Sequence, residues 1–319
     1  MNLTVSVIIP TKDRAGDLVA AVRSLFLQTV TPNQLIILDQ SASDESERQI
    51  SALLAEASAK VRDRLKLNHV RDTTVTGLAS ARNRSLEMAH ADVCLFLDDD
   101  VVLEPNFLEE LLTVYSNHPE AAGVSGIVTN YPLPDRFTRW WSAVFVRGVL
   151  HDDRQPVYWS AGRLRDQSPI QVSRLGGGLM SFRTEAIRGV RFDEALEGVS
   201  DGEDVDFCAR LGPKAVLLIS PRARLVHNQS PSGRERNYWV RRHGRALYYL
   251  YRKNWKHGVV NRLSFVWLNV GYAFVATLGS ARRLSLDPWR ALCDARRDAK
   301  EIQRRARARD RDLPVQGAA

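Results

Sequence analysis

An apolar run ending in three adjacent carboxylates stands at Cys94-Leu95-Phe96-Leu97-Asp98-Asp99-Asp100-Val101-Val102. A run of this length is typical of a strand buried on both faces of a parallel sheet. Three adjacent acids repel one another, so they stabilise no fold by themselves. At the carboxyl end of a parallel strand, this acid triplet (residues 98–100) would lie where α/β sheets bind ligands, and it would attract a hard divalent cation. The alternative is a solvated acidic turn.

Apolar runs and helical patterns alternate along the first third of the chain. Strands are predicted at residues 5–9, 35–38, 65–70 and 94–97, and helices near residues 13–26, 43–54, 77–89 and 105–115. Asp13 is expected to cap the first of these helices. Alternation of this kind predicts a doubly wound α/β sheet.

Polar or acidic loops follow three of the four predicted strands, after Ile9, Leu38 and Leu97. Right-handed crossovers place the carboxyl ends of parallel strands at one edge of a sheet. We therefore expect Asp13, Asp39 and the acid triplet to converge at that edge, although they are remote in sequence.

Three later segments break the alternation. Residues 130–173 are rich in Trp, Arg and Pro and are interpreted as a long, partly ordered excursion over the site. Gly176-Gly177-Gly178 leads into an apolar strand and allows a close approach of the backbone to a ligand, or forms a bulge or turn. Glu203 and Asp204 are predicted in the first turn of a helix, where acids are also favoured by the helix dipole alone.

Together these segments resemble the family 2 glycosyltransferases, of the non-processive bacterial type. The resemblance covers about residues 4–255 and rests on six motifs in order: Val7-Ile8-Ile9-Pro10-Thr11, Asp39 with Ser41 and Asp44, Ala81-Arg82-Asn83, Phe96-Leu97-Asp98-Asp99-Asp100, Gly176-Gly177-Gly178 and Gly202-Glu203-Asp204. It implies the GT-A fold, an α/β architecture with a Rossmann-like, mostly parallel sheet flanked by helices. Residues 1–255 would form this domain, with a nucleotide-sugar-binding half (1–128) and an acceptor-binding half (129–255).

The family transfers a sugar from a nucleotide-diphosphate donor, usually with inversion. The resemblance implies that the donor contacts ten residues: Pro10, Thr11, Asp13, Arg14, Asp39, Ser41, Arg82, Asn83, Asp98 and Asp99. Within this set Asp39 would bind the base, and Arg82, a planar cation, suits a phosphate.

The same resemblance implies a cofactor and a general base. Asp98, Asp100 and His227 would hold Mg²⁺ or Mn²⁺, which relieves charge on the leaving diphosphate. A lone histidine is often structural, so both readings of His227 remain open. Asp204 would take the proton of the acceptor hydroxyl in a single displacement. The acceptor would contact Gly177, Gly178 and Glu203.

One departure from the family concerns processivity. Processive members carry a Gln-x-x-Arg-Trp signature after the acceptor region, and Arg236-Asn237-Tyr238-Trp239-Val240-Arg241-Arg242-His243 does not match it. We therefore expect one sugar to be transferred for each encounter with an acceptor.

Residues 256–319 are predicted as a helical, basic extension. The 319-residue chain has a formal net charge of +8, and much of its positive charge follows residue 233, which favours an anionic partner. Residues 263–279 carry no charge, include Asn269 and have basic flanks, which suits a helix in the interface of an anionic membrane. The alternative is a buried helix. A charged helix is predicted at residues 287–312.

The expected location is the cytoplasm, at the inner face of the plasma membrane, with a glycan or lipid-linked acceptor. The three cysteines have no metal-ligand or redox spacing, which fits a reducing compartment. No nucleic-acid-binding motif accompanies the basic region, so nucleic acid is not an expected partner. Two alternative functions remain: a nucleotidyltransferase, which the loop Pro10-Thr11-Lys12-Asp13-Arg14 disfavours because it lacks a Gly-rich motif, and a catalytically silent protein that binds sugar nucleotides.

Overall fold

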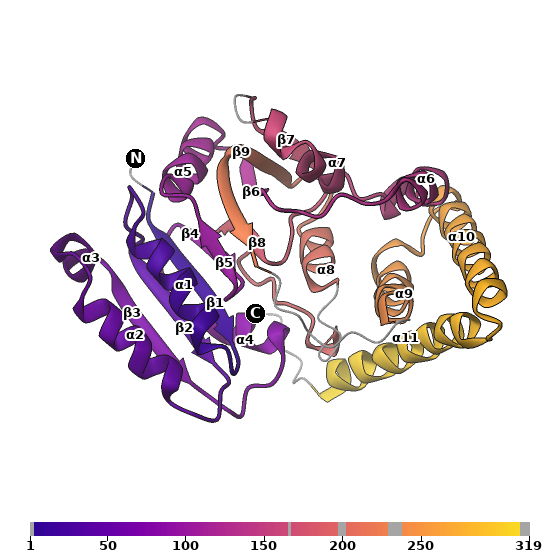
Figure 1. Cartoon of the computed structure of the whole chain (residues 1–319), viewed down its shortest axis with the longest axis horizontal. Helices are drawn as coiled ribbons and strands as arrows, with labels where there is room; N and C mark the ends of the chain where they lie inside the picture. Colours follow the sequence, from indigo (N-terminus) through magenta and orange to yellow (C-terminus); the bar gives the residue numbers. More distant parts are fainter. Residues whose placement is uncertain (1–2, 165–166, 197–201, 229–237, 313–319) are drawn as a thin grey trace, which may run out of the picture. The chain divides into compact units, whose positions relative to one another are not determined.

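The computed structural model describes residues 3–164, 167–196, 202–228 and 238–312 (Figure 1). The chain divides into two compact units. The first comprises Met1–Leu133, Asp152–Phe192 and Phe207–Ser230, and the second comprises Pro134–His151, Asp193–Asp206 and Pro231–Ala319.

A nine-stranded sheet organises the first unit, in the order β3-β2-β1-β4-β8-β6-β9-β5 with β7 paired to β9. Its strands are β1 (Val5–Thr11), β2 (Gln34–Asp39), β3 (Lys66–Arg71), β4 (Val93–Leu97), β5 (Val101–Leu103), β6 (Ala121–Val128), β7 (Ile170–Val172), β8 (Leu179–Arg183) and β9 (Val216–His227). The first four strands pair in parallel, as the alternation predicted. The sheet is mixed beyond β4, because β8 runs antiparallel to both β4 and β6.

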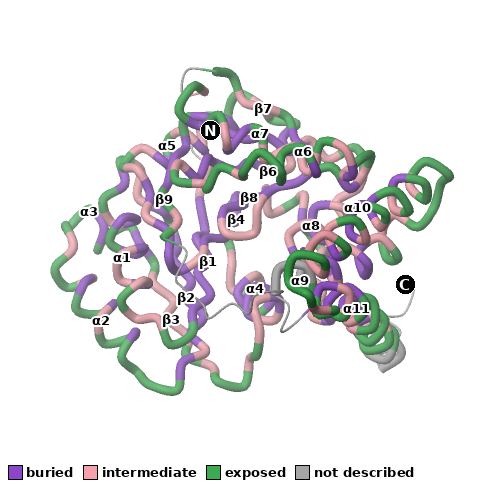
Figure 2. Tube along the Cα trace, turned by 45° about the vertical axis from the view of Figure 1, so that its right-hand side comes forward, coloured by how far each residue is buried: buried purple, intermediate pink, exposed green. Residues whose placement is uncertain are grey.

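Side chains that alternate along the central strands enter two apolar clusters, one on each face of the sheet. Val7 and Ile9 of β1 pack in one cluster with Leu18, whereas Ile8 packs in the other with Ala79. Successive side chains of a strand point to opposite faces, so a continuous apolar run is what a strand covered on both sides requires. β1, β2 and β4 are buried throughout (Figure 2).

Helices in the first unit are α1 (Ala15–Phe26), α2 (Glu45–Ala55), α3 (Ala59–Arg64), α4 (Leu78–Leu86), α5 (Phe107–Asn117), α7 (Arg154–Trp159) and the 3-10 turn η2 (Ala161–Arg163). α8 (Glu203–Arg210) begins in the second unit and ends in the first. The predicted excursion at residues 130–173 contains regular elements, among them α7 and β7 of the first unit.

The predicted helix cap at Asp13 is wrong. α1 begins at Ala15, its N-cap residue is Arg14, and no side chain caps it. Asp13 instead has a φ of 54°, a left-handed conformation that aspartate tolerates better than most residues. Its backbone N–H donates to Ser41 Oγ at 2.7 Å, which ties the loop after β1 to the loop after β2.

The second unit is helical. It contains α6 (Arg136–Phe145), the 3-10 turns η1 (Gly148–Leu150) and η3 (Glu194–Leu196), α9 (Tyr238–Leu250), the π-helical turn η4 (Tyr251–Trp255), α10 (Val259–Arg283) and α11 (Asp287–Asp312). The predicted charged helix at residues 287–312 is confirmed as α11. α6 and α10 approach each other closely at Gly271, whose carbonyl accepts from Trp141 Nε1 at 3.0 Å.

α10 contains the uncharged stretch and is long and apolar enough to cross a membrane, with a mean hydropathy of 1.4 over a window that is 28% buried. Length and composition alone are weak evidence for a span, because helices inside soluble proteins share them. Many residues of α10 are exposed or half-buried (Figure 2). The exposed apolar side chains are Val259, Val260, Leu263, Val266, Trp267, Val270 and Phe274.

Candidate active site

The carboxyl ends of β1 and β2 bring the first predicted site residues together. Thr11 and Asp39 are neighbours in the parallel register of these strands. Asp39 is fully buried, and its Oδ1 accepts from the backbone N–H of Ser41 at 2.8 Å. The Asp13–Ser41 hydrogen bond joins the loops that follow β1 and β2. The two loops therefore lie side by side at one edge of the sheet, as was predicted for loops that follow neighbouring parallel strands.

The acid triplet follows β4, and one guanidinium group compensates two of its members. Arg14 donates from Nη1 to Asp99 Oδ1 at 2.6 Å and from Nη2 to Asp100 Oδ2 at 2.8 Å. Asp99 Oδ2 also accepts from Thr11 Oγ1 at 2.7 Å. Charge-assisted hydrogen bonds of this kind offset the repulsion between neighbouring carboxylates. Arg14, predicted as a donor contact, is thus also the counter-ion of the triplet.

The two carboxyl groups that Arg14 holds differ in acidity. Burial raises the pKa of Asp99 to about 6, despite the hydrogen bond from Thr11 and the charge of Arg14. Burial acts in the same direction on Asp100, but the hydrogen bonds and charges of His227 and Arg14 outweigh it and hold the pKa of Asp100 well below its usual range. Asp100 is therefore ionised at neutral pH and suited to bind a cation.

Asp98, Asp100 and His227 form a cluster whose potential ligand atoms all lie within 4.8 Å of one another. His227 Nε2 is 3.0 Å from Asp100 Oδ1 and 3.8 Å from Asp98 Oδ2. The sheet explains the proximity, because Val101, next to the triplet, pairs with His227 where β5 meets β9. Burial tends to lower the pKa of His227, but the hydrogen bond to Asp100 and the nearby carboxylates raise it.

This donor set fits a divalent cation. Carboxylate oxygens suit Mg²⁺ and Mn²⁺, and imidazole nitrogen is a common ligand of transition metals. Gly178 leaves the space free, since a Cβ atom there would lie 2.4 Å from Asp98 Oδ2 and 3.5 Å from His227 Cε1. The backbone N–H of Asp98 donates to the carbonyl of Gly178 at 3.3 Å. The acceptor contacts predicted for Gly177 and Gly178 stay predictions.

Arg82 is a buried residue that contacts the cluster through Asp98. Its side chain is 1% exposed, and Nη2 donates to the carbonyl of Gly177 at 2.6 Å and lies 3.4 Å from Asp98 Oδ1. The guanidinium also lies 5.4 Å from the ring centroid of Phe192. Asn83 is hydrogen-bonded in both directions to the backbone of Phe192. The structure therefore gives Arg82 and Asn83 intramolecular contacts, while their predicted contacts with the donor stay predictions.

His69 of β3 was missed from the sequence. Its Nε2 lies 3.5 Å from Asp39 Oδ2, and both side chains are buried. Burial acts to raise the pKa of Asp39, but the neighbouring imidazole of His69 and hydrogen bonds from Ser41 lower it. The histidine thus helps to keep Asp39 ionised. A single histidine in a short polar strand gives no signal of this contact, which is diagonal across the β2–β3 pair because His69 lies opposite Ile37, two residues before Asp39.

Glu203 and Asp204 begin α8, as predicted, and lie in the second unit. Asp204 Oδ1 accepts from the backbone N–H of Val205 at 2.8 Å, and Glu203 is buried. Their roles as base and acceptor contact stay predictions. In the same turn, buried Asp206 lies 2.9 Å from Lys253 Nζ. Of the non-matching signature at 236–243, residues 236 and 237 lie outside the described part of the chain.

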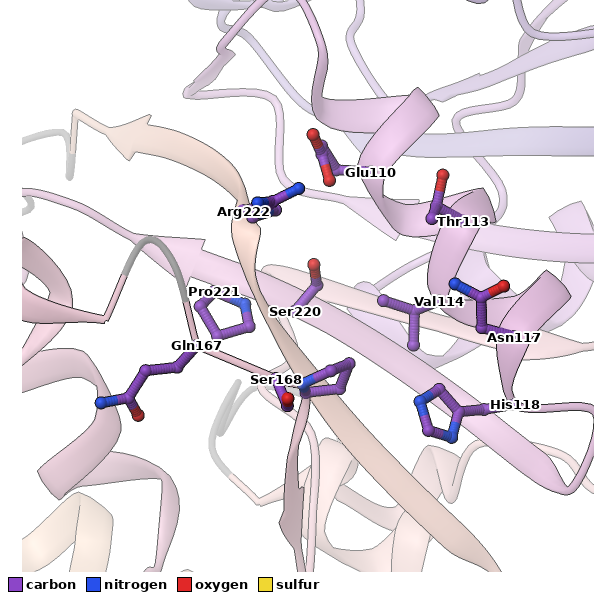
Figure 3. A pocket seen from close by; sticks show the side chains of 11 residues that line it. Glu110, Thr113, Val114, Asn117, His118, Gln167, Ser168, Ser220, Pro221 and Arg222 are labelled. Atoms are coloured by element: carbon purple, nitrogen blue, oxygen red, sulfur yellow. The ribbon is translucent and has the colours of Figure 1, made fainter.

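A pocket elsewhere in the first unit has a volume of about 260 Å³ (Figure 3). Side chains of α5, of His118 directly after it, of residues 167–169 and of residues 220–222 line it. None of the predicted site residues belongs to this lining, and the chemistry-bearing groups gather at the sheet edge instead.

Comparison with known proteins agrees with this arrangement. The model of glycosyl transferase family 2 matches residues 6–188. A glucosyl-dolichyl phosphate glucuronosyltransferase of Haloferax volcanii is 27% identical over 139 residues, which are 44% of this chain and 41% of the relative. The match therefore spans about two fifths of the length of that relative.

Solved structures share the fold at low sequence identity. S. aureus TarS 1-349 in complex with UDP-GlcNAc has a TM-score of 0.57 at 17% identity, covering 92% of this chain and 79% of that one. The mannosyltransferase PcManGT from Pyrobaculum calidifontis, in complex with GDP-Man and Mn²⁺, has a TM-score of 0.55 at 15% identity, covering 96% and 87%. Since the family model covers more than half of the chain and the sheet is the one its motifs implied, the protein belongs to glycosyltransferase family 2 and has the GT-A fold.

Proposed function

We propose that this glycosyltransferase moves a single sugar, with inversion and with a divalent cation, from a nucleotide-diphosphate sugar to a glycan or lipid-linked acceptor. The observation that carries the proposal is the cluster of Asp98, Asp100 and His227 beside Gly178, at the carboxyl edge of the parallel strands. An acidic cluster in this crevice suits a diphosphate bound through a cation.

The cation would be held by Asp98, Asp100 and His227, and when bound it would supply charge relief for the departing diphosphate. Mn²⁺ is the preferred candidate beside Mg²⁺, because the cluster combines carboxylates with an imidazole. The solved structure of PcManGT is a complex with GDP-Man and Mn²⁺, which supports the same pairing of donor and cation here.

The chain's own residues would orient the donor. Thr11 and Arg14 hold Asp99 and Asp100 in place, so the sheet edge presents a preorganised surface to the nucleotide. Asp39, kept ionised by its buried contacts with Ser41 and His69, would accept hydrogen bonds from the base. Preorganised polar groups of this kind do not have to reorient when the substrate arrives.

Asp204 would act as the general base. Its carboxylate takes the proton of the acceptor hydroxyl while the hydroxyl oxygen forms a bond to the anomeric carbon. The bond between that carbon and the diphosphate oxygen breaks on the opposite face, and the nucleoside diphosphate leaves. Asp204→Asn should fold and bind donor but lose transfer by roughly 100-fold or more, since a positioned base contributes on this scale. Near-normal turnover in this variant would remove Asp204 from the base role.

One assay separates this activity from its alternatives. Release of nucleoside diphosphate is measured over a panel of donors and acceptors, with and without Mn²⁺. Release that requires both metal and acceptor supports sugar transfer. Release of pyrophosphate would indicate a nucleotidyltransferase, and donor binding without turnover would indicate a silent binding protein.

The proposed location is the cytoplasmic face of the plasma membrane, with peripheral attachment to anionic lipid. Support comes from the exposed apolar side chains of α10 and from basic residues near both of its ends, including Arg262, Arg282 and Arg283. Such a helix suits the boundary between headgroups and acyl chains. The Haloferax volcanii relative is named as a glucosyl-dolichyl phosphate glucuronosyltransferase, and this name supports a lipid-linked acceptor here.

A further inference from the structure

A basic pocket opens in the second unit beside the exposed surface of α10. Its volume is about 400 Å³, and α9, η4, α10 and α11 all contribute to it. The lining residues, called here the basic pocket, are Tyr248, Arg252, Phe265, Val266, Asn269, Arg296, Ala299 and Lys300. Three of them are cations, and none is an acid.

The positive charge of the basic pocket is not cancelled by carboxylates. Among the described residues, Arg252, Arg296 and Lys300 form no ion pair. The acids of α11 nearest in sequence are paired elsewhere, Asp294 with Arg297, Asp298 with Arg241 and Glu301 with Arg304 and Arg305. Three uncompensated cations around one cavity favour an anionic ligand.

Arg296 is held in position for such a ligand. Its Nε donates to Tyr248 Oη at 2.7 Å, and its Nη2 donates to Asn269 Oδ1 at 3.0 Å. The guanidinium lies 5.3 Å from the ring centroid of Tyr248. Asn269, the polar residue in the uncharged stretch, also donates to the carbonyl of Phe265 at 2.6 Å. A fixed guanidinium recognises phosphate with little further loss of conformational freedom.

One wall of the basic pocket continues into an apolar stripe. Val266 lines the pocket and is 61% exposed. Val259, Leu263 and Val270 recur with it at intervals of three or four residues, so the four share one face of α10. Each of them is exposed. A soluble surface rarely keeps so continuous an apolar stripe unless another apolar surface covers it.

We propose that the basic pocket binds the phosphate group of a membrane lipid whose hydrocarbon chain lies along the Val259–Val270 stripe. The cations of the basic pocket would bind the phosphate, and the adjoining apolar stripe would contact the hydrocarbon chain of the lipid. One amphiphilic lipid would therefore occupy both parts of this surface. Such a site rests on the membrane attachment proposed above, but it does not depend on the transfer reaction.

The test measures binding of the full chain to vesicles of phosphatidylcholine with and without phosphatidic acid. Arg296→Gln combined with Lys300→Gln removes two cations from the pocket. Arg297→Gln combined with Arg304→Gln removes the same charge from exposed positions of the same helix. We expect the pocket variant to lose about tenfold or more in affinity for phosphatidic-acid vesicles and the control to lose less than about threefold. Equal losses in the two variants would overturn the pocket in favour of general charge attraction.

A second arm separates a lipid phosphate from free phosphate. Inorganic phosphate alone is titrated into the protein, and Val266→Ser is tested on vesicles. The lipid assignment predicts weak binding of inorganic phosphate and weaker vesicle binding by Val266→Ser. Inorganic phosphate bound as tightly as the vesicles, or vesicle binding unchanged in Val266→Ser, contradicts it.

Two controls make the result of the vesicle-binding test interpretable. If the double variant does not fold, Lys300→Gln alone is used, because Lys300 is exposed and makes no hydrogen bond within the described residues. A loss of about threefold is expected from removing this one cation and a smaller loss from Arg304→Gln alone, and equal losses in these two single variants, or an unchanged affinity in Lys300→Gln, overturn the proposal. The pocket variants should keep metal-dependent release of nucleoside diphosphate with a soluble acceptor. Absence of that release in the unmodified protein would count against the proposed function and not against the basic pocket.

Discussion

Gly178→Ala should disable the proposed cation site while leaving the fold intact. The added Cβ atom would lie 2.4 Å from Asp98 Oδ2 and 3.1 Å from Asp98 Cγ. A carbon and an oxygen normally stay about 3.3 Å apart, so the carboxylate must move by roughly 1 Å. It can move, because the Asp98 side chain is 29% exposed. The backbone at Gly178 lacks the positive φ that would exclude alanine.

Moving one ligand by about 1 Å weakens the site considerably. We expect a loss of roughly 10- to 100-fold in Mn²⁺ affinity, which corresponds to about 1.4 to 2.7 kcal/mol. Turnover at limiting Mn²⁺ should fall by a similar or larger factor, because misplacing a reacting group by about 1 Å can cost about 100-fold in rate. Calorimetric titration with Mn²⁺ measures the affinity, and thermal unfolding shows whether the fold is kept.

Gly162→Ala is the matched control, because a Cβ atom there would meet nothing within 4 Å. It should bind Mn²⁺ as the unmodified protein does. Gly178→Ala with unchanged Mn²⁺ affinity and turnover would refute the assignment of Asp98 as a ligand. Unfolding of Gly178→Ala would equally refute the claim that the Asp98 side chain alone absorbs the contact.

Two further variants test packing and charge away from the site. Burial acts to raise the pKa of Asp152, but the charge of Arg154 and its hydrogen bonds lower it to about 2. Asp152→Asn should therefore cost about 2 kcal/mol in urea unfolding at neutral pH, and the difference should fade as the pH drops from about 4 towards 2, where the wild-type carboxylate is protonated. Gly271→Ala would place a Cβ atom 2.5 Å from Phe145 Cγ, so it should destabilise the protein by about 1–2 kcal/mol despite the helix propensity of alanine. A more stable Gly271→Ala protein would contradict the close approach of α6 and α10.

The parallel half of the sheet was predictable because its strands are buried on both faces. Val5–Thr11 and Val93–Leu97 are almost uninterrupted apolar runs. Short runs of this kind are typical of strands that are buried on both faces of a sheet. The predicted bounds of α11 were equally secure, since its charged pattern continues without a break. Strand direction beyond β4 was not predictable, because pairing partners depend on tertiary contacts that a local pattern does not contain.

The candidate site was predictable in its residues but not in its contacts. The motifs placed Asp98, Asp100 and His227 together through family resemblance, and the β5–β9 pairing supplies the physical reason. The counter-ion role of Arg14 has no local signal, since it depends on where α1 begins beside the acid triplet. The contact of Asp39 with His69 is of the same kind, because it depends on the pairing of β2 with β3, which α2 and α3 separate in the chain.

The bridge from Arg14 to two acids of the triplet has a consequence for the order of events in the cell. A cluster of carboxylates without compensation would force a newly made chain to capture its metal in order to fold, as zinc fingers do. Here a built-in cation already balances Asp99 and Asp100. If the proposed cation is required, the chain can therefore reach its native state in a cell short of divalent metal, and metal scarcity would then lower activity without unfolding the protein.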